Sequence, residues 1–490
     1  MPARPPRSCK DLLPRRACAR RRVPRMATAI ETIAQWAAGT PPITSPAARQ
    51  KAARGIVDTV AVMLAGSAEP AAIKALTALR ACSGPVTAFP DARLAAPFAA
   101  LVNGTAAHAM DFDDGENVGF THVSAVLVPA LLALGEERHA SGAASIDAYI
   151  VGVEAIVRVG EWIGVGHYGR GWHSTSTVAA LGAAAACARL IGLDAVATGR
   201  AISIAASMAG GFRSQFGTMV KPLHAGFGAK SGVLAAILAE AGIDGSNEAL
   251  DGRFGFDTLM ADKPKRTFAE AVQLGAPLWL EDFCPSAKRF AACGSTHGAL
   301  DAILELKAEH AFSLADVAAF ETMLPDISYS TLIATPPANE MEARFSLEHC
   351  AAVAIDKGAL ALADFAPHVL TRPDYLAFRD RVTIHPYDGT NAYRDGVYWT
   401  RTEITLRDGR VLATEVTDKR GSSRNPLSDQ DLADKFRMCA GHSFDLRGTD
   451  AILARLFAID AVPDIAGLLS DIRSAIVLRM TPPVPWHPSA

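Results

Sequence analysis

Apolar residues recur at helical spacing through most of the first half of the chain. One run begins after Ser45-Pro46, a favourable cap followed by a first-turn proline, and it ends at Gly66. The same spacing predicts four further helices, one from Ser145 onward and the others over 174–193, 194–210 and 221–242. No strand of five or more β-branched residues interrupts this half. The pattern therefore predicts a helical domain over residues 27–282.

The pattern changes between residues 283 and 416. Asp408-Gly409, between two apolar runs, is typical of a β-hairpin turn. Strands are predicted over 318–324, 382–384 and 402–406. Helices are expected to begin near His297 and after Ser346. This segment is predicted to be a smaller α+β unit inserted into the helical body.

Helical spacing returns over residues 417–480. Ser428 with Asp431 three positions later predicts a helix start, and further helices follow over 452–459 and 465–476. Residues 481–490 are left as a tail. The predicted fold is mainly α, with a large all-helical domain formed by both ends of the chain.

The composition excludes several classes of protein. Of the 490 residues 50% are hydrophobic and 20% are charged, a balance typical of a globular chain rather than a disordered one. The net charge of −3 gives no electrostatic basis for binding nucleic acid. The longest weakly polar stretch, 176–193, is rich in alanine and contains Arg189, so no membrane span is expected.

Residues 1–26 form a basic leader. The first 25 residues hold nine basic side chains against one acid, Asp11, which leaves a net charge of −11 on the rest. Five prolines break any amphipathic helix there, and no apolar secretion segment is present. We expect translation to start at Met26 and the leader to be disordered or untranslated. Eight scattered cysteines without a CxxC pair favour reduced thiols and a cytoplasmic location.

The densest cluster of polar side chains follows the apolar run 97–110. The cluster comprises His108, Asp111, Asp113, Asp114 and, further on, His122. His108 and Asp111 share a face if the helix extends that far. Three interpretations stay open for these residues: an acid–base site, a Mg²⁺ site for phosphate chemistry, or a helix end with solvated charges.

Two other segments place reactive side chains near predicted helix starts. His173 directly precedes a helix, whose N-terminus attracts anions, so it could meet a substrate carboxylate or merely belong to a capping turn. Lys221 lies among glycines and apolar residues with His224 three positions later. It could be an anion clamp, a tuned proton carrier or a surface lysine. His297 and His349, taken alone, are more often structural than catalytic.

Five motifs occur in order along the chain: Asn103-Gly104 with 108–114, Gly171-Trp172-His173, 217–226, Ser295-Thr296-His297 and Arg344-Phe345-Ser346. In this combination the chain resembles the MmgE/PrpD family over about residues 27–476. That family includes 2-methylcitrate dehydratase, cis-aconitate decarboxylase and iminodisuccinate epimerase. The resemblance implies an inserted α+β lid, an active site between lid and helical domain, and a homodimer that uses no metal or organic cofactor.

The resemblance also implies roles for individual residues. It implies a catalytic set, Asp111, His173 and His297, and a substrate-binding set, His122, Lys221, His349 and His224. Lys221 and His122 are expected to hold substrate carboxylates. His173, helped by Asp111, is the expected principal acid–base group, and His297 the second proton carrier.

The function expected from these residues is that of a cofactor-independent lyase. It would abstract a proton next to a carboxylate of a small di- or tricarboxylate, as a 2-methylcitrate dehydratase-like hydro-lyase does. Decarboxylation and epimerisation stay open because they need only a different fate of the same carbanion. A Mg²⁺-dependent phosphate enzyme and a non-catalytic helical scaffold stay open as well. Gly115 and His349 replace a threonine and a tyrosine expected in the family, so the exact substrate is not fixed by these motifs.

Overall fold

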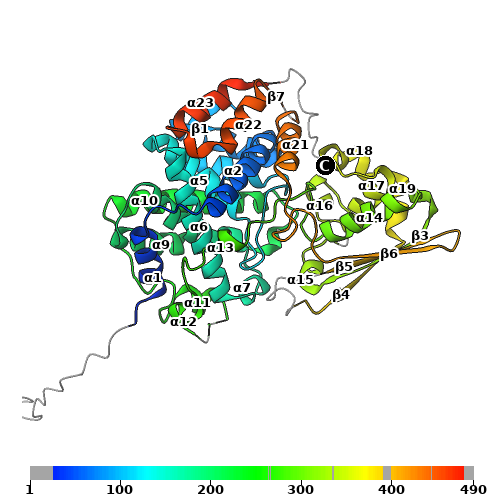
Figure 1. Cartoon of the computed structure of the whole chain (residues 1–490), viewed down its shortest axis with the longest axis horizontal. Helices are drawn as coiled ribbons and strands as arrows, with labels where there is room; N and C mark the ends of the chain where they lie inside the picture. Colours follow the sequence, from blue (N-terminus) through cyan, green and yellow to red (C-terminus); the bar gives the residue numbers. More distant parts are fainter. Residues whose placement is uncertain are drawn as a thin grey trace, which may run out of the picture.

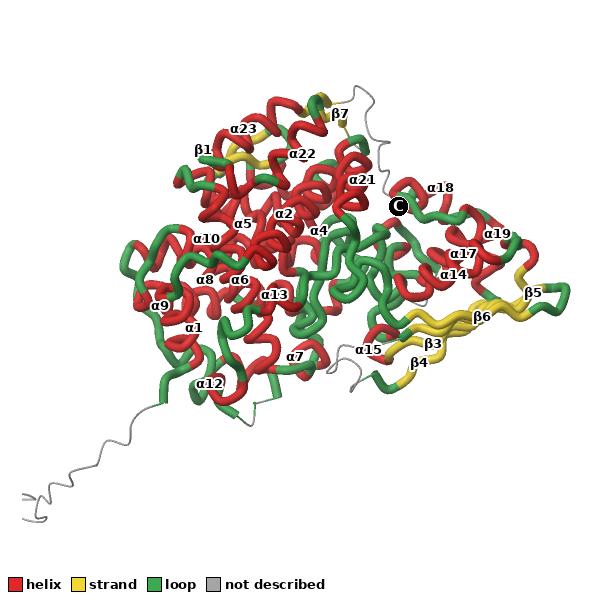
Figure 2. The backbone as a smooth tube through the Cα atoms, in the orientation of Figure 1, coloured by secondary structure: helices red, strands yellow, loops and turns green. Residues whose placement is uncertain are grey.

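A computed structural model describes residues 26–478, except 263, 265, 334–335, 390–398 and 443. Residues 1–25 of the basic leader and the 481–490 tail lie outside the described residues. Helices dominate the larger part of the molecule, and a four-stranded sheet lies at one end (Figure 2).

Long helices, several with faces of small residues, build the larger body. They are α1 (Ala29–Gly39), α2 (Pro46–Gly66), α3 (Pro70–Leu79), α4 (Ala96–His108), α5 (Val123–Arg138), α6 (Gly142–Ile163), α8 (Ser174–Leu190), α9 (Ala195–Met208) and α10 (Val220–Glu240). α10 packs against α4 and α8, and α6 packs against α8. Glycines allow this approach, since a Cβ on Gly226 would lie 2.3 Å from the Leu101 carbonyl oxygen. The last turn of α4 thereby lies beside the first turn of α10.

Local sequence signals account for many of these helix ends. The Ser45 side chain accepts a hydrogen bond from the Ala48 amide at the start of α2, as predicted. The helix predicted from Ser145 instead begins at Gly142, because Ser141 caps it. Shorter helices are α7 (Gly166–Gly169), α11 (Phe256–Met260), α12 (Phe268–Ala271), α13 (Trp279–Asp282), α15 (Asp326–Tyr329), α16 (Glu340–Ala343) and α18 (Pro367–Leu370).

The first half is not entirely helical, which corrects the sequence prediction. β1 (Ser83–Ala88) and β2 (Ala92–Leu94) form an antiparallel hairpin. β1 has little strand propensity, with Gly84 and Pro85 in it, so pattern alone did not reveal it. Distant side chains hold it instead: Asn103 accepts from the Phe89 amide at 2.9 Å and donates to the Thr87 carbonyl at 2.9 Å.

The α+β unit lies where the sequence predicted strands (Figure 1). Its sheet comprises β3 (Val317–Pro325), β4 (Val382–Tyr387), β5 (Thr400–Leu406) and β6 (Val411–Val416), in the order β4-β3-β5-β6. β3 and β4 are parallel and the other pairs antiparallel. Gly409, with φ +89°, turns the β5–β6 hairpin. α14 (His297–Glu309) packs on β5 and β6, and α17 (Leu347–Lys357) packs between α14 and α19 (Pro373–Arg379).

The end of the chain returns to the helical body. α21 (Asp429–Ala440) begins with the predicted Ser428–Asp431 capping box and packs with α22 (Thr449–Phe457) on α2. α23 (Ile465–Ala475) packs on α5, and β7 (Phe444–Leu446) pairs with β8 (Ile476–Leu478). α21, α22 and α23, orange to red in Figure 1, therefore lie against α2 and α5, which are blue and cyan.

Within the described residues, no single helix is long and apolar enough to cross a membrane. α2 and α3 reach that length and composition only as a pair, and the pair is bent by 80°.

Candidate active site

A cavity of about 140 Å³ lies where the helical body meets the α+β unit. One water molecule needs about 10–15 Å³ on this measure, so the cavity has room for a small organic molecule. Its wall is formed by the 111–122 loop, the N-terminal ends of α8 and α10, the 286–297 segment and the 419–421 linker. Segments far apart in the sequence therefore share one cavity.

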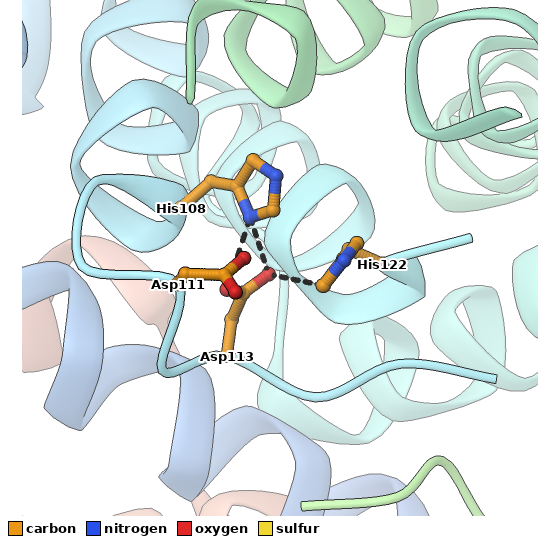
Figure 3. Close-up of side chains that lie close together, drawn as sticks. All are labelled: His108, Asp111, Asp113 and His122. Carbon is orange, nitrogen blue, oxygen red and sulfur yellow. Dashed lines mark hydrogen bonds and ion pairs between the residues drawn. The ribbon is translucent and has the colours of Figure 1, made fainter. Parts of the chain in front are cut away.

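The loop after α4 brings two acidic residues, Asp111 and Glu116, to the wall of this cavity. α4 ends at His108, and Asp111 has φ +50°, a left-handed conformation that residues other than glycine rarely adopt. The helix does not extend to Asp111, so the two residues do not share a helix face. The turn nevertheless gathers ligand-type atoms of His108, Asp111, Asp113 and His122 within 4.8 Å of one another (Figure 3).

Asp111 is neutralised by two buried lysines. The Lys221 ammonium contacts Asp111 Oδ1, and Lys288 Nζ lies 3.0 Å from Oδ2 and 2.6 Å from the Asp111 carbonyl oxygen. Burial alone would raise the pKa of Asp111, but the two ammonium groups outweigh it and hold that pKa well below its usual value. Burial likewise opposes the charge on Lys288, yet Asp111 and Asp113 raise its pKa. Asp111 and Lys288 are therefore both charged near neutral pH.

The hydrogen bonds around Asp113 fix the proton positions on two histidines. Lys221 Nζ lies 2.9 Å from His108 Nε2, and an ammonium only donates, so the His108 proton is on Nδ1. That Nδ1 donates to both Asp113 oxygens, at 3.0 and 2.9 Å. His122 Nδ1 lies 3.0 Å from Asp113 Oδ2 and 2.8 Å from the Asp114 carbonyl oxygen, which are both acceptors. Nε2 is therefore the ring nitrogen of His122 that is left for a ligand in the cavity.

These contacts leave His108 neutral and Asp113 ionised. Burial, the largest effect, lowers the pKa of His108 to about 3. Burial would raise the pKa of Asp113, but the two imidazole donors outweigh it and lower that pKa well below its usual value. The chain Asp113–His108–Lys221 thus orients the Lys221 ammonium at the cavity wall, where it also lies 5.2 Å from the Phe345 ring centre.

The same cluster contains the ligand types of a metal site, two histidines and two carboxylates. However, both Asp111 oxygens already contact an ammonium group, and His108 Nε2 accepts from Lys221. A divalent cation here would have to displace Lys221 or lie between two positive charges. The donor set therefore fits lysine rather than Mg²⁺, which argues against a phosphate-processing enzyme.

His173 lines the cavity as the N-cap residue of α8. Its Nδ1 lies 2.9 Å from His224 Nδ1, so one ring donates and the other accepts, which leaves His173 Nε2 for a ligand. Burial, reinforced by Lys221 and His224, holds the pKa of His173 well below its usual value. Burial and then Lys221 lower the pKa of His224 to about 4. Both rings are neutral near pH 7.

The α+β unit contributes His297, and the linker that follows it contributes Lys419. His297 begins α14, and its Nε2 donates to the Ala292 carbonyl oxygen at 3.2 Å, which leaves Nδ1 unprotonated in the neutral ring. Burial, followed by Lys419 and Lys288, holds the pKa of His297 well below its usual value. Lys419 Nζ donates to the Gly294 carbonyl oxygen at 2.8 Å.

The structure brings most of the sequence-predicted residues together. Those that line the cavity are Asp111, His122, His173, Lys221 and His297. His224 lies behind His173 and acts on the cavity only through that ring. His349 is not brought to the cavity: it is buried on α17, where its Nε2 donates to the Asp364 carbonyl oxygen at 3.0 Å. Its expected contact with substrate does not fit this position.

Sequence reasoning missed several residues of the site. His108 and Asp113 stood in the polar cluster, but nothing local showed that they form a chain ending at Lys221. Lys288 and Lys419 lie in irregular segments, where their charges look like ordinary surface charges. Only the packing of distant segments reveals them.

Comparisons with known proteins give matches to one family along most of the chain. Residues 31–269 match the MmgE/PrpD N-terminal domain, and residues 290–458 match the MmgE/PrpD C-terminal domain. The cis-aconitate decarboxylase of Homo sapiens is 30% identical over 396 residues, which cover 78% of this chain and 81% of the human protein. That of Mus musculus is 33% identical over 362 residues, covering 71% and 72%. That of Aspergillus terreus is 26% identical over 393 residues, covering 76% and 80%.

Proposed function

Because the chain belongs to the MmgE/PrpD family and is a lyase, we propose that it removes CO₂ from a small tricarboxylate of the cis-aconitate type. The three relatives from Homo sapiens, Mus musculus and Aspergillus terreus are all cis-aconitate decarboxylases, which favours a carboxy-lyase over the hydro-lyase expected from the sequence. A cytoplasmic homodimer acting on a small acidic metabolite is part of the same proposal.

One observation carries the proposal: cationic and imidazole groups from both halves of the chain line one cavity. Lys221, Lys288, Lys419 and Arg420 bring four basic side chains to the lining, against two carboxyl groups there, Asp111 and Glu116. The excess of positive charge suits a ligand with several carboxylates. Imidazole nitrogens of His122, His173 and His297 line the same space and can take part in proton transfer.

The reaction replaces one carboxylate by one proton. The bond from carbon to the departing carboxylate breaks, CO₂ leaves, and the electron pair passes into the neighbouring C=C unit, whose far carbon takes up a proton. The lysines stabilise the negative charge that spreads onto the remaining carboxylates. Such positioned groups lower barriers most where water is excluded.

His173 is the proposed proton donor. In the unliganded cavity it is neutral, but bound carboxylates add negative charge beside it and raise its pKa. The imidazolium form then becomes accessible only in the complex, where Nε2 can deliver its proton to carbon while the Nδ1–H stays donated to His224 Nδ1.

A panel of three substrates separates decarboxylation from dehydration and epimerisation on the same scaffold. The purified protein is incubated with cis-aconitate, 2-methylcitrate and iminodisuccinate, and CO₂ release, water loss and optical rotation are followed. We expect CO₂ release from cis-aconitate that survives exhaustive chelation. Water loss from 2-methylcitrate alone would make the protein a hydro-lyase, and a change of rotation alone would make it an epimerase. Both results contradict the decarboxylase proposal.

A further inference from the structure

We propose that Lys419 forms a second carboxylate-binding subsite, which holds one end of the substrate while Lys221 holds another. This inference rests on the proposed function and adds a specificity-determining residue to it. Lys221 belongs to the helical body, whereas Lys419 lies in the linker after β6 that leads back to that body. Lys288 lines the same cavity, with its ammonium on Asp111.

The first argument is charge. Lys221 and Lys288 are both paired with Asp111, and Arg420, which also lines the cavity, is paired with Asp431 at 2.6 Å. Lys419 has no carboxylate partner among the described residues, and Gly294 O is its hydrogen-bond acceptor there. An ammonium carries three donors. Two of them are therefore left for an anionic ligand.

The second argument is placement. The Arg420 amide donates to Asp301 Oδ2 on α14 at 2.7 Å, which anchors the linker beside the cavity. Gly421 has φ +91°, and a Cβ there would lie 2.0 Å from the Ala287 carbonyl oxygen, so the linker is seated directly on the 286–297 segment. A lysine on such a fixed backbone loses less freedom when it binds a ligand.

The third argument is the neighbourhood. The Ser295 hydroxyl lines the same part of the cavity, and its Oγ lies 2.8 Å from Thr331 Oγ1. α14 begins two residues later at His297, so the partial positive charge of its N-terminal end adds to that of Lys419. The ammonium group, the hydroxyl group and the helix N-terminus can all bind a carboxylate.

The surroundings also make this subsite sensitive to pH. Burial, helped by Lys288, lowers the pKa of Lys419 to about 8, while Cys293 and Asp301 oppose the shift. His297 on α14 and Arg420 on the linker are the other titratable or charged groups that face it. Lys419 is charged below its pKa and neutral above it. Affinity for a polycarboxylate is therefore expected to fall as the pH rises through about 8, and less so in Lys419→Arg.

The test uses three unreactive acids as probes: tricarballylate, with three carboxylates, and glutarate and methylsuccinate, which each lack one of them. Dissociation constants are measured by calorimetry at pH 7 for the wild type, Lys419→Met and Lys419→Arg. Lys74→Met, on the exposed side of α3, is the control for loss of one lysine. Thermal unfolding without ligand shows whether each variant is folded.

We expect Lys419→Met to weaken tricarballylate binding by about 10- to 100-fold and Lys419→Arg to retain most of it. The dicarboxylate that lacks the carboxylate held by Lys419 should bind to the wild type and to Lys419→Met with equal affinity. Equal tricarballylate affinity in wild type and a folded Lys419→Met would overturn the subsite alone, as would equal losses for all three acids. If no probe binds the wild type, the proposed function fails and the subsite fails with it.

Discussion

At the scale of single residues, the site depends on which groups are charged and which are neutral. Asp111 and Asp113 stay ionised because ammonium and imidazole donors surround them. Asp114, their neighbour, behaves oppositely: burial and the nearby Asp58 raise its pKa to about 8. It lies against Ser124, whose amide donates to Oδ1 at 3.2 Å. Three nearby carboxyl groups thus differ in charge at the same pH.

The protonated Asp114 predicts a pH dependence of stability. An aspartate in the unfolded chain has a pKa of about 3.9, so the folded state holds a proton that the unfolded state releases between about pH 4 and 8. The free energy of unfolding should fall over this range by up to about 1.4 kcal/mol per pH unit from this group. In Asp114→Asn that contribution disappears.

Urea unfolding at pH 5, 6.5 and 8 measures this effect as the difference between the wild type and Asp114→Asn. The wild type should lose stability relative to the variant as the pH rises. Asp244→Asn, the same change at an exposed position, is the control. Identical pH slopes in the wild type and Asp114→Asn would show that Asp114 is ionised in the folded protein.

At the scale of elements, the close packing of α4 on α10 brings His108 to Lys221. Gly104 and Gly226 are the contact points, since a Cβ on Gly104 would lie 3.0 Å from the Gly226 Cα. Any added side chain must push the two helices apart. Helix packing and the geometry of the lysine are therefore coupled.

Gly226→Ala should destabilise the protein by about 1–3 kcal/mol and lower activity, because the added methyl group meets the Leu101 carbonyl oxygen and Thr105 Oγ1. Chemical denaturation and turnover of the folded variant measure the two effects. Gly467→Ala on α23 is the matched control, since no atom lies within 4 Å of its added Cβ. It should be neutral or slightly stabilising. If Gly226→Ala and Gly467→Ala had equal free energies of unfolding, the close contact between α4 and α10 at Gly226 would be contradicted.

Elements with local signals could be predicted from the sequence. The caps at Ser45, Ser346 and Ser428 and the hairpin at Gly409 depend on neighbouring residues, and each is confirmed. The β1–β2 hairpin could not be predicted, because side chains distant in sequence hold it. The polar cluster at 108–114 is local in the sequence and could be predicted. Lys288 and Lys419 reach the site only through contacts between distant segments, so they could not. His349 shows the converse, a residue selected from a motif that tertiary packing directs away from the cavity.

At the scale of the whole molecule, a buried lysine outside the cavity joins four segments. Lys435 on α21 donates to the carbonyl oxygens of Phe112 at 2.8 Å and Lys288 at 3.0 Å, and lies 2.7 Å from Asp58 Oδ1 on α2. Lys435 thus makes two hydrogen bonds to carbonyl oxygens and one ion pair with Asp58. The returning chain end therefore fixes both the acidic loop and the Lys288 segment.

Lys435→Met should lower the unfolding free energy by about 3–5 kcal/mol, because it leaves the buried Asp58 without its cation. The double variant Asp58→Asn with Lys435→Met should regain part of the loss, since no unpaired charge remains. Arg437→Gln, on the exposed side of the same helix, should change stability by less than about 1 kcal/mol. Unfolding in urea compares the four proteins. A double variant no more stable than Lys435→Met alone would contradict the pairing.

The central claim is that lysines and imidazoles gathered from both halves of the chain exchange a carboxylate of a metabolite for a proton. Turnover of cis-aconitate in D₂O, followed by NMR together with CO₂ release, tests it most directly. We predict one deuterium bound to carbon in the product for each CO₂ released, and rates at least about 100-fold lower in folded Lys221→Met and His173→Ala. No CO₂ release by the wild type, or wild-type rates in both variants, would contradict the account.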